Sequence, residues 1–191
     1  MIPLLPELVR IAGVFDAEGI PYAVIGGIAV RALGVPRPTY DLDFTIVNDD
    51  LDRILTVLET NYEVPETYRR GWLDRVSGMP LFKIKLRKNL EAIDIDIFVA
   101  DTSFQQSMLA RRQLVDYEGF RFWCAAAEDV ILLKLIANRS RDLGDVEDVL
   151  FMQGLLDVEY MRRWARELEV EPLLLNALRK YDAYLPLIDP V

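Results

Sequence analysis

The sequence predicts an α/β fold, a mixed β-sheet flanked by helices, with a helical region in the C-terminal part. Three observations support this prediction. Apolar and polar residues alternate over 41–46, 81–87 and 91–99, a period of two that is typical of strands. From Ala126 onward, apolar residues instead recur at helical spacing. Hydrophobic residues make up 52% of the 191 positions, which is enough for a packed core.

The first sixty residues contain three segments with a clear local pattern. Apolar residues at helical spacing predict a helix over 4–18, and Gly19 is a typical helix end. The short apolar run 22–25 predicts a buried strand. Polar residues 48–50 are candidate N-caps for a further helix over 51–60.

The middle of the chain alternates between strand, turn and helix patterns. We expect 81–87 and 91–99 to form a hairpin, and residues 101–103 to cap a helix that runs to Arg112. The segment 66–78 is expected to be a loop or an irregular helix. Two shorter strand patterns complete this part, a single strand at 62–64 and a small hairpin at 114–117 and 120–123.

Four helices are expected after the last strand pattern, at 126–137, 145–153, 157–169 and 172–181, with a break at 140–144. We therefore expect an α/β core over 1–125 and a helical region over 126–191 packed on it.

Composition excludes several kinds of chemistry. The chain has no histidine, which removes Ser-His-Asp and Cys-His hydrolases and ordinary His-ligated zinc sites. A net charge of −9 argues against broad, non-specific nucleic-acid binding, which depends on neutralising phosphates. Catalysis is left to carboxylates, Lys, Arg, Tyr, Ser, Thr or a metal.

Other features predict a cytoplasmic protein without a membrane partner. Cys124 is the only cysteine, so no internal disulfide is expected. No apolar run approaches the ~20 residues of a membrane helix. The first seven residues lack the basic region of a signal peptide.

The stretch 22–46 carries the main functional signal. Gly26 and Gly27 follow a strand pattern and precede a helix expected over 28–33. Glycines let a backbone come close to a ligand, and the start of a helix favours anions. Asp41 and Asp43 follow on the next strand and leave its same face.

Two parallel carboxylates repel each other unless a cation lies between them. Mg²⁺ commonly binds such oxygen sites together with substrate phosphates. The alternative is a surface turn followed by two solvated aspartates, because short motifs often occur by chance. The pairing with Gly-Gly favours a site for a metal-bound nucleoside triphosphate.

A second acidic pair, Asp94 and Asp96, alternates with isoleucines over 91–99. On a neighbouring strand it would complete the metal site. A basic row over 83–87 would lie beside this pair if the two strands face the same way. The alternative for the lysines of this row is protection of an exposed sheet edge or ordinary cross-strand ion pairing.

These pieces resemble the DNA-polymerase-β-type nucleotidyltransferase superfamily, and more narrowly the small bacterial AbiEii/MenT-like enzymes, often toxins of toxin–antitoxin pairs. The shared pattern is a glycine turn, an Asp-x-Asp strand and a third acidic residue on a later strand. Here these would be 26–27, then Asp41 with Asp43, then Asp96 or Asp94.

Further positions fit the resemblance. Arg37 and Thr39 correspond to an Arg-x-Thr that leads into the aspartates. A helical lysine would be Lys134, and a later Arg-Asp motif would be 141–145, ending at Asp145. The resemblance spans roughly residues 20 to 150, and the last forty residues match nothing in the pattern.

The resemblance implies metal-assisted nucleotidyl transfer with Mg²⁺ or Mn²⁺. The implied catalytic residues are Asp41, Asp43, Asp96 and Lys134. The implied metal ligands are Asp41, Asp43, Asp94 and Asp96. The implied nucleotide-binding residues are Gly26, Gly27, Arg37, Thr39, Lys134 and Asp145.

Plainer roles remain open for several of these residues. Lys134 could instead pack its stem on apolar neighbours and extend its amine to water. Arg141 and Asp142 could form a helix-end cap or a surface pair, and Asp145 could be an N-cap.

The implied partners are a nucleoside triphosphate and a hydroxyl acceptor, which could be RNA, a protein or a small molecule, with a cognate antitoxin as a possible further partner. Two other functions remain open. One is a non-catalytic nucleotide- or partner-binding module of the same fold. The other is kinase-like transfer of the γ-phosphate by the same metal site.

Overall fold

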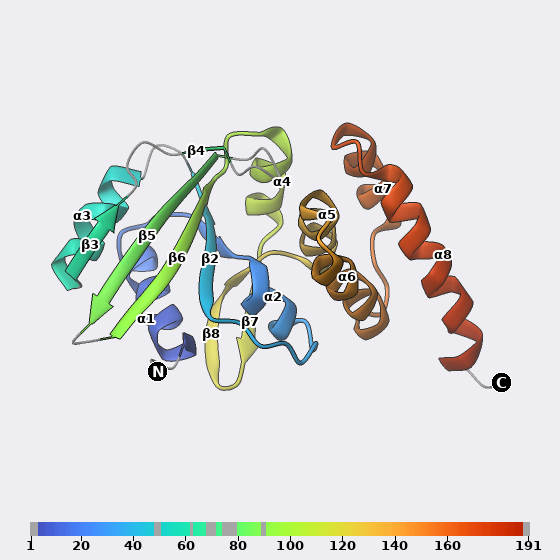
Figure 1. Ribbon diagram of the computed structural model, residues 1–191, viewed down its shortest axis with the longest axis horizontal. Coiled ribbons are helices and arrows are strands. Elements are labelled where there is room, and N and C mark those ends of the chain that lie inside the picture. Colours follow the sequence, from blue (N-terminus) through green and yellow to red (C-terminus); the bar gives the residue numbers. More distant parts are fainter. Residues whose placement is uncertain are drawn as a thin grey trace.

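The computed structural model describes residues 4–47, 51–61, 63–67, 72–73, 80–88 and 91–188, without side chains at 51, 61–92 and 183–188 (Figure 1). The helices are α1 Leu4–Ala17, α2 Gly26–Ala32, α3 Leu51–Asn61, α4 Ser103–Arg111, α5 Ala127–Ala137, α6 Ser140–Met152, α7 Val158–Glu167 and α8 Glu171–Ile188. The strands are β1 Tyr22–Val24, β2 Asp41–Ile46, β3 Glu63–Thr67, β4 Trp72–Leu73, β5 Pro80–Lys88, β6 Glu91–Val99, β7 Gln113–Tyr117 and β8 Phe120–Cys124.

All the described strands belong to one mixed sheet. Their order is β3-β5-β6-β2-β1-β8-β7, and β4 pairs with β5 outside this path. The pairs β2–β6 and β1–β8 are parallel, and the others are antiparallel. The predicted α/β fold with a mixed sheet and flanking helices is therefore confirmed.

One face of the sheet is covered by α1, which packs against β2, β8 and α3. Phe15 of α1, Tyr22 of β1 and Phe44 of β2 form an aromatic cluster there, with ring centroids 5.5 to 6.1 Å apart. Successive side chains of a strand leave opposite faces. Phe44 therefore lies on the face covered by α1, and Asp43 lies on the opposite face.

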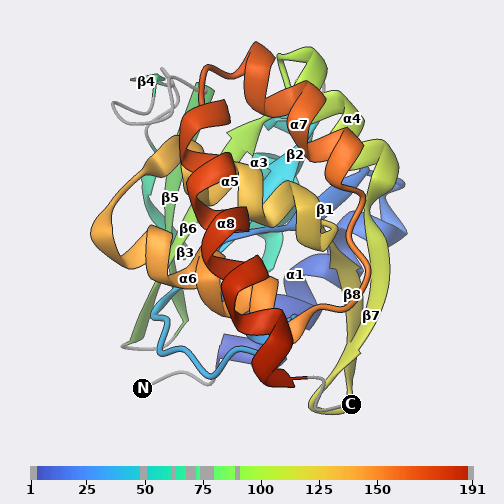
Figure 2. The ribbon, with the colours of Figure 1, turned by 90° about the vertical axis from the view of Figure 1, so that its right-hand side faces the viewer.

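The later helices lie together beyond the other side of the sheet (Figure 1), and a view from that side shows them in front of the strands (Figure 2). Helix α5 contacts α2, α6, α7 and α8. One main cluster of buried apolar residues includes members from both halves of the chain. The proposed boundary between 125 and 126 stays a prediction.

Two predicted boundaries were wrong. Helix α2 begins at Gly26, so both glycines lie in its first turn and not before it. Helix α6 begins at Ser140, where a break over 140–144 was expected. The chain turns earlier, at Asn138, whose left-handed conformation (φ 48°) ends α5.

One further local prediction is confirmed, and two others concern residues that the structure does not describe in full. Thr102 caps α4 as expected, in a capping box with Gln105. The predicted caps at 48–50 and most of the expected loop at 66–78 lie outside the described residues. Among the described residues, no helix is long and apolar enough to cross a membrane.

Candidate active site

The register between β2 and β6 brings two acidic pairs side by side. Because these strands are parallel neighbours, Asp41 is paired with Asp94 and Asp43 with Asp96. Alternation then places all four carboxylates on one face of the sheet. The residues that alternate with these aspartates along the two strands are fully buried on the opposite face: Leu42, Phe44, Ile95 and Ile97.

The glycine turn is pressed against the second of these aspartates. Gly26 has φ +64°, and a Cβ atom there would lie 1.9 Å from Oδ2 of Asp43. The backbone N–H of Gly27 donates a hydrogen bond to the Asp43 carboxylate. Any side chain at position 26 would therefore displace Asp43, and the left-handed backbone there also favours glycine.

The second glycine is required by the loop that leads into β2. A Cβ atom at Gly27 would lie 2.3 Å from Nη1 of Arg37 and 2.4 Å from Oγ1 of Thr39. Thr39 in turn donates a hydrogen bond of 2.9 Å to Oδ1 of Asp41. The turn, the loop and the first aspartate thus hold one another in place.

A buried ion network from α5 and α6 faces this turn. Lys134 is 6% exposed, and its Nζ lies 2.9 Å from Oδ1 of Asp142 and 2.7 Å from Oδ2 of Asp145. Nε of Arg37 lies 3.0 Å from Oδ1 of Asp145. Arg139 also pairs with Asp142. Asp145 therefore bridges the lysine on α5 and the arginine of the β2 loop.

This network decides between the alternatives that the sequence left open. Lys134 does not extend its amine to water. Asp142 and Asp145 are buried within α6, so neither is a surface residue or an N-cap. Arg141 donates a hydrogen bond to the carbonyl of Pro38, which fastens α6 to the same loop.

Asp43 has the most perturbed acidity in the site. Burial and, after it, the neighbouring carboxylates of Asp41 and Asp96 raise the pKa of its carboxyl, which stands at about 7. The positive charge of Lys134 and the N–H of Gly27 oppose this rise. The ionised form of Asp43 is therefore unfavourable in free energy, and a cation beside the carboxylate would stabilise it.

The donor set fits a hard divalent cation. Carboxylate oxygens are the ligands that Mg²⁺ prefers, and the repulsion at Asp43 is the kind that an ion removes. Within the described part of the chain, no three acidic or cysteine side chains already converge on one point. Asp41 accepts a hydrogen bond from Thr39, and Asp43 accepts one from Gly27.

Two residues of the network, Asp142 and its partner Arg139, were not among the predicted site residues. Asp142 receives a hydrogen bond from Lys134 and is 1% exposed. A lysine inside an otherwise apolar helical run needs a buried counterion, because an unpaired buried charge is very costly. That requirement pointed to an acidic residue on a neighbouring helix, and two follow within eleven positions.

A family model described as "Nucleotidyltransferase of unknown function (DUF6036)" matches residues 10–183. The chain belongs to this DUF6036 family. It is therefore a nucleotidyltransferase, and the transferase class expected from the sequence is confirmed. No curated protein sequence is detectably similar to this DUF6036 member. The narrower resemblance to AbiEii/MenT-like enzymes stays a prediction.

Solved structures show the same fold at low sequence identity. An antigenic nucleotidyltransferase-like protein from Paracoccidioides brasiliensis is 21% identical, with a TM-score of 0.64 over 95% of this chain and 89% of its own. ANT(2'')-Ia in complex with adenylyl-2''-tobramycin is 15% identical, with a TM-score of 0.56 over 86% of this chain and 97% of its own. The lincomycin-bound lincosamide antibiotic adenylyltransferase LnuA is 15% identical, with a TM-score of 0.53 over 78% of this chain and 97% of its own.

Proposed function

We propose that this DUF6036 protein transfers a nucleoside monophosphate from a nucleoside triphosphate to a hydroxyl acceptor, with Mg²⁺ or Mn²⁺ bound. The observation that carries the proposal is the register of β2 and β6, which sets Asp41 beside Asp94 and Asp43 beside Asp96. The glycine turn packed on Asp43 adds the first turn of α2, which it holds against these carboxylates.

The two acidic pairs have different proposed roles. Asp41 and Asp43 would hold the ion that binds the triphosphate. Asp96, with Asp94 as the alternative or additional ligand, would serve the attacking hydroxyl and take up its proton. The bound metal supplies charge stabilisation at the α-phosphate as the acceptor oxygen attacks and pyrophosphate leaves. Without histidine in the chain, proton uptake falls to carboxylates and metal-bound groups.

The cations of the buried network would face the triphosphate. Lys134 lies close enough to Asp43 for its positive charge to oppose the rise in the pKa of that carboxyl. Its two carboxylate partners fix its position, which preorganises a point charge for a phosphate. Arg37 is held beside Gly27 by Asp145 in the same way.

Among acceptors, we propose a small hydroxyl compound ahead of RNA or a protein. The structures of similar fold include one with adenylyl-2''-tobramycin and one with lincomycin, both small molecules. The net charge of −9 also makes a large polyanion a less natural partner. A role in a toxin–antitoxin pair, a cognate antitoxin and a cytoplasmic location stay predictions.

The decisive experiment supplies each nucleoside triphosphate, labelled at the α-phosphate, together with Mg²⁺. Panels of hydroxyl-bearing small molecules, total RNA and proteins serve as acceptors. Wild type is compared with Asp43→Asn and with Asp116→Asn, a control whose exposed carboxylate pairs with Arg121 on the β7–β8 hairpin. We expect wild type and the control to transfer label and Asp43→Asn to transfer none.

Two results would redirect the proposal. Transfer of a γ-label without an α-label would establish a kinase-like reaction at the same site. Nucleotide binding without transfer of either label, unchanged by Asp43→Asn, would favour a non-catalytic binding module.

A further inference from the structure

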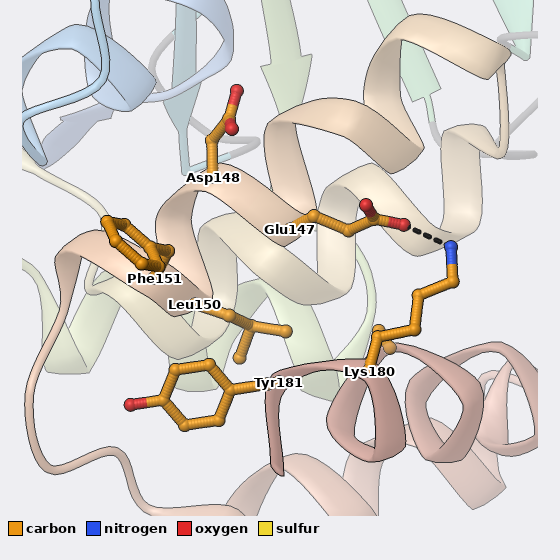
Figure 3. Close-up of a pocket in the computed structure, with 7 residues that line it drawn as sticks. Glu147, Asp148, Leu150, Phe151, Lys180 and Tyr181 are labelled. Carbon is orange, nitrogen blue, oxygen red and sulfur yellow. Dashed lines mark hydrogen bonds and ion pairs between the residues drawn. The ribbon is translucent and has the colours of Figure 1, made fainter. Parts of the chain in front are cut away.

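A second recess lies between α6 and α8, apart from the candidate active site (Figure 3). Its volume is about 220 Å³. With 3.6 residues per turn, Glu147, Leu150 and Phe151 of its lining lie on a different side of α6 from Asp142 and Asp145. The lining residues are Glu147, Asp148, Leu150, Phe151, Ala177, Lys180 and Tyr181.

Phe151, which lines the recess, is one of the few large hydrophobic residues exposed in the described part of the chain. Phe151 is 56% exposed and Met152 is 49% exposed, and Leu155 is fully exposed. Only two other large hydrophobic residues are exposed in the described part of the chain, Tyr40 and Leu114. Three of these five residues fall within positions 151–155, and of the three Phe151 lines the recess. Contiguous exposed apolar surface is typical of interaction sites.

The rim of the recess carries excess negative charge. Glu147 is paired with Lys180 across one side, as Figure 3 shows. Asp148 is exposed and has no hydrogen bond or ion pair among the described residues. A partner that places a positive charge beside this rim would be favoured.

The size of the recess argues for a side chain and not for a whole small molecule. Sites for small organic ligands usually measure about 300–1,000 Å³. The 220 Å³ recess is smaller and suits one large apolar side chain. The apolar surface beyond it suits further contacts along an extended partner. An amphipathic helix in an apolar groove uses this arrangement.

We propose that the α6–α8 recess is a docking site for an amphipathic, basic segment of a partner protein. One leucine- or phenylalanine-sized anchor would fill the space between Leu150 and Ala177. Neighbouring apolar residues of the segment would cover Phe151, and a lysine or arginine would face Asp148. The site is independent of the proposed nucleotidyl transfer.

The test uses synthetic peptides as probes. The first is a fluorescein-labelled helical peptide with leucines at i, i+3, i+4 and i+7 and lysines along one flank. The second carries glutamates in place of the lysines, and the third carries serines in place of the leucines. Fluorescence anisotropy gives the Kd of each peptide for the full chain.

Three variants of the protein complete the design. Ala177→Leu fills the recess, and Asp148→Lys reverses the free rim charge. Glu167→Lys makes the same charge change on exposed α7 and serves as the control. We expect Ala177→Leu to weaken the lysine peptide by roughly tenfold or more, and Asp148→Lys by roughly two- to fivefold. The control should leave the Kd unchanged.

Several outcomes would overturn the proposal. One is a lysine peptide that binds no tighter than the glutamate or serine peptides. Another is an unchanged Kd in both Ala177→Leu and Asp148→Lys, the second of which alters only an exposed side chain and should fold normally. A third is a wild-type dimer in light scattering that Ala177→Leu converts to a monomer, because a second copy would then occupy the recess.

Discussion

Replacing Asp43 with asparagine should stabilise the metal-free protein at alkaline pH while abolishing transfer. The pKa of this carboxyl rises from 3.8 to about 7, chiefly because the group is buried. A group with a raised pKa in the folded state contributes stability that is fully present below pH 3.8 and is lost as the pH rises through 7. Each pKa unit corresponds to about 1.36 kcal/mol, so the full loss is on the order of 4 kcal/mol.

Asparagine keeps the shape of the side chain and an oxygen that can accept the N–H of Gly27. It removes the charge that Asp41 and Asp96 repel. In EDTA at pH 8, we therefore expect Asp43→Asn to raise the free energy of unfolding by about 2–4 kcal/mol, allowing for screening by water. At pH 4 the two proteins should differ little.

Urea denaturation followed by circular dichroism, at pH values from 4 to 8, measures this difference. Added Mg²⁺ at pH 8 should stabilise the wild type by about 1.4 kcal/mol when its concentration is ten times its Kd, and should not stabilise Asp43→Asn. The control Asp116→Asn should instead lower the free energy of unfolding at pH 8, because Arg121 lowers the pKa of Asp116. An Asp43→Asn variant less stable than wild type in EDTA at pH 8 would refute the reasoning.

Three further predictions concern other parts of the fold. Gly26→Ala should abolish transfer and destabilise the protein by about 1–3 kcal/mol, measured by thermal unfolding, because its backbone has φ +64° and a Cβ atom would strike Asp43. Gly13→Ala, at a helical position with no atom within 4 Å of the added carbon, should instead stabilise it by about 0.5–1 kcal/mol. Lys134→Met should cost about 3–5 kcal/mol in urea denaturation because it leaves two buried carboxylates with one arginine partner each, and a change below 1 kcal/mol would contradict the network. Burial raises the pKa of Asp129 to about 6, so the stability it contributes is lost as the pH rises from about 4 through 6, and Asp129→Asn should flatten that part of the stability profile.

The shared face of Asp41 and Asp43 could be predicted from the sequence because strand side chains alternate. A neighbouring strand with a second acidic pair was expected as well, but its register was not. Pairing of β2 with β6 is a tertiary contact between strands separated by α3, β3, β4 and β5, and no local pattern specifies it. The sequence also left Asp94 and Asp96 as alternatives, and the register pairs one with each aspartate of β2.

The helical half shows a different limit. A break over 140–144 was expected because Ser140 and Gly144 lower helix propensity. Tertiary contacts override that preference, since Asp142 and Asp145 must both reach Lys134 from one helix. Whether Lys134 forms buried ion pairs or extends its amine to water could be decided only once these two partners were located. A single lysine in an apolar run indicates a buried charge but does not identify its counterions.

The order in which the chain is synthesised separates the parts of the candidate site. Asp41 and Asp43 belong to β2, their strand neighbours arrive with β6, and the lysine and its counterions arrive only with α5 and α6. Contacts so distant along the chain form late in folding because long loops must close first. A nascent chain that has not yet released α6 from the ribosome would therefore hold the acidic strands without their balancing cations. Catalytic competence would appear only after α6 has left the ribosome and packed against α5.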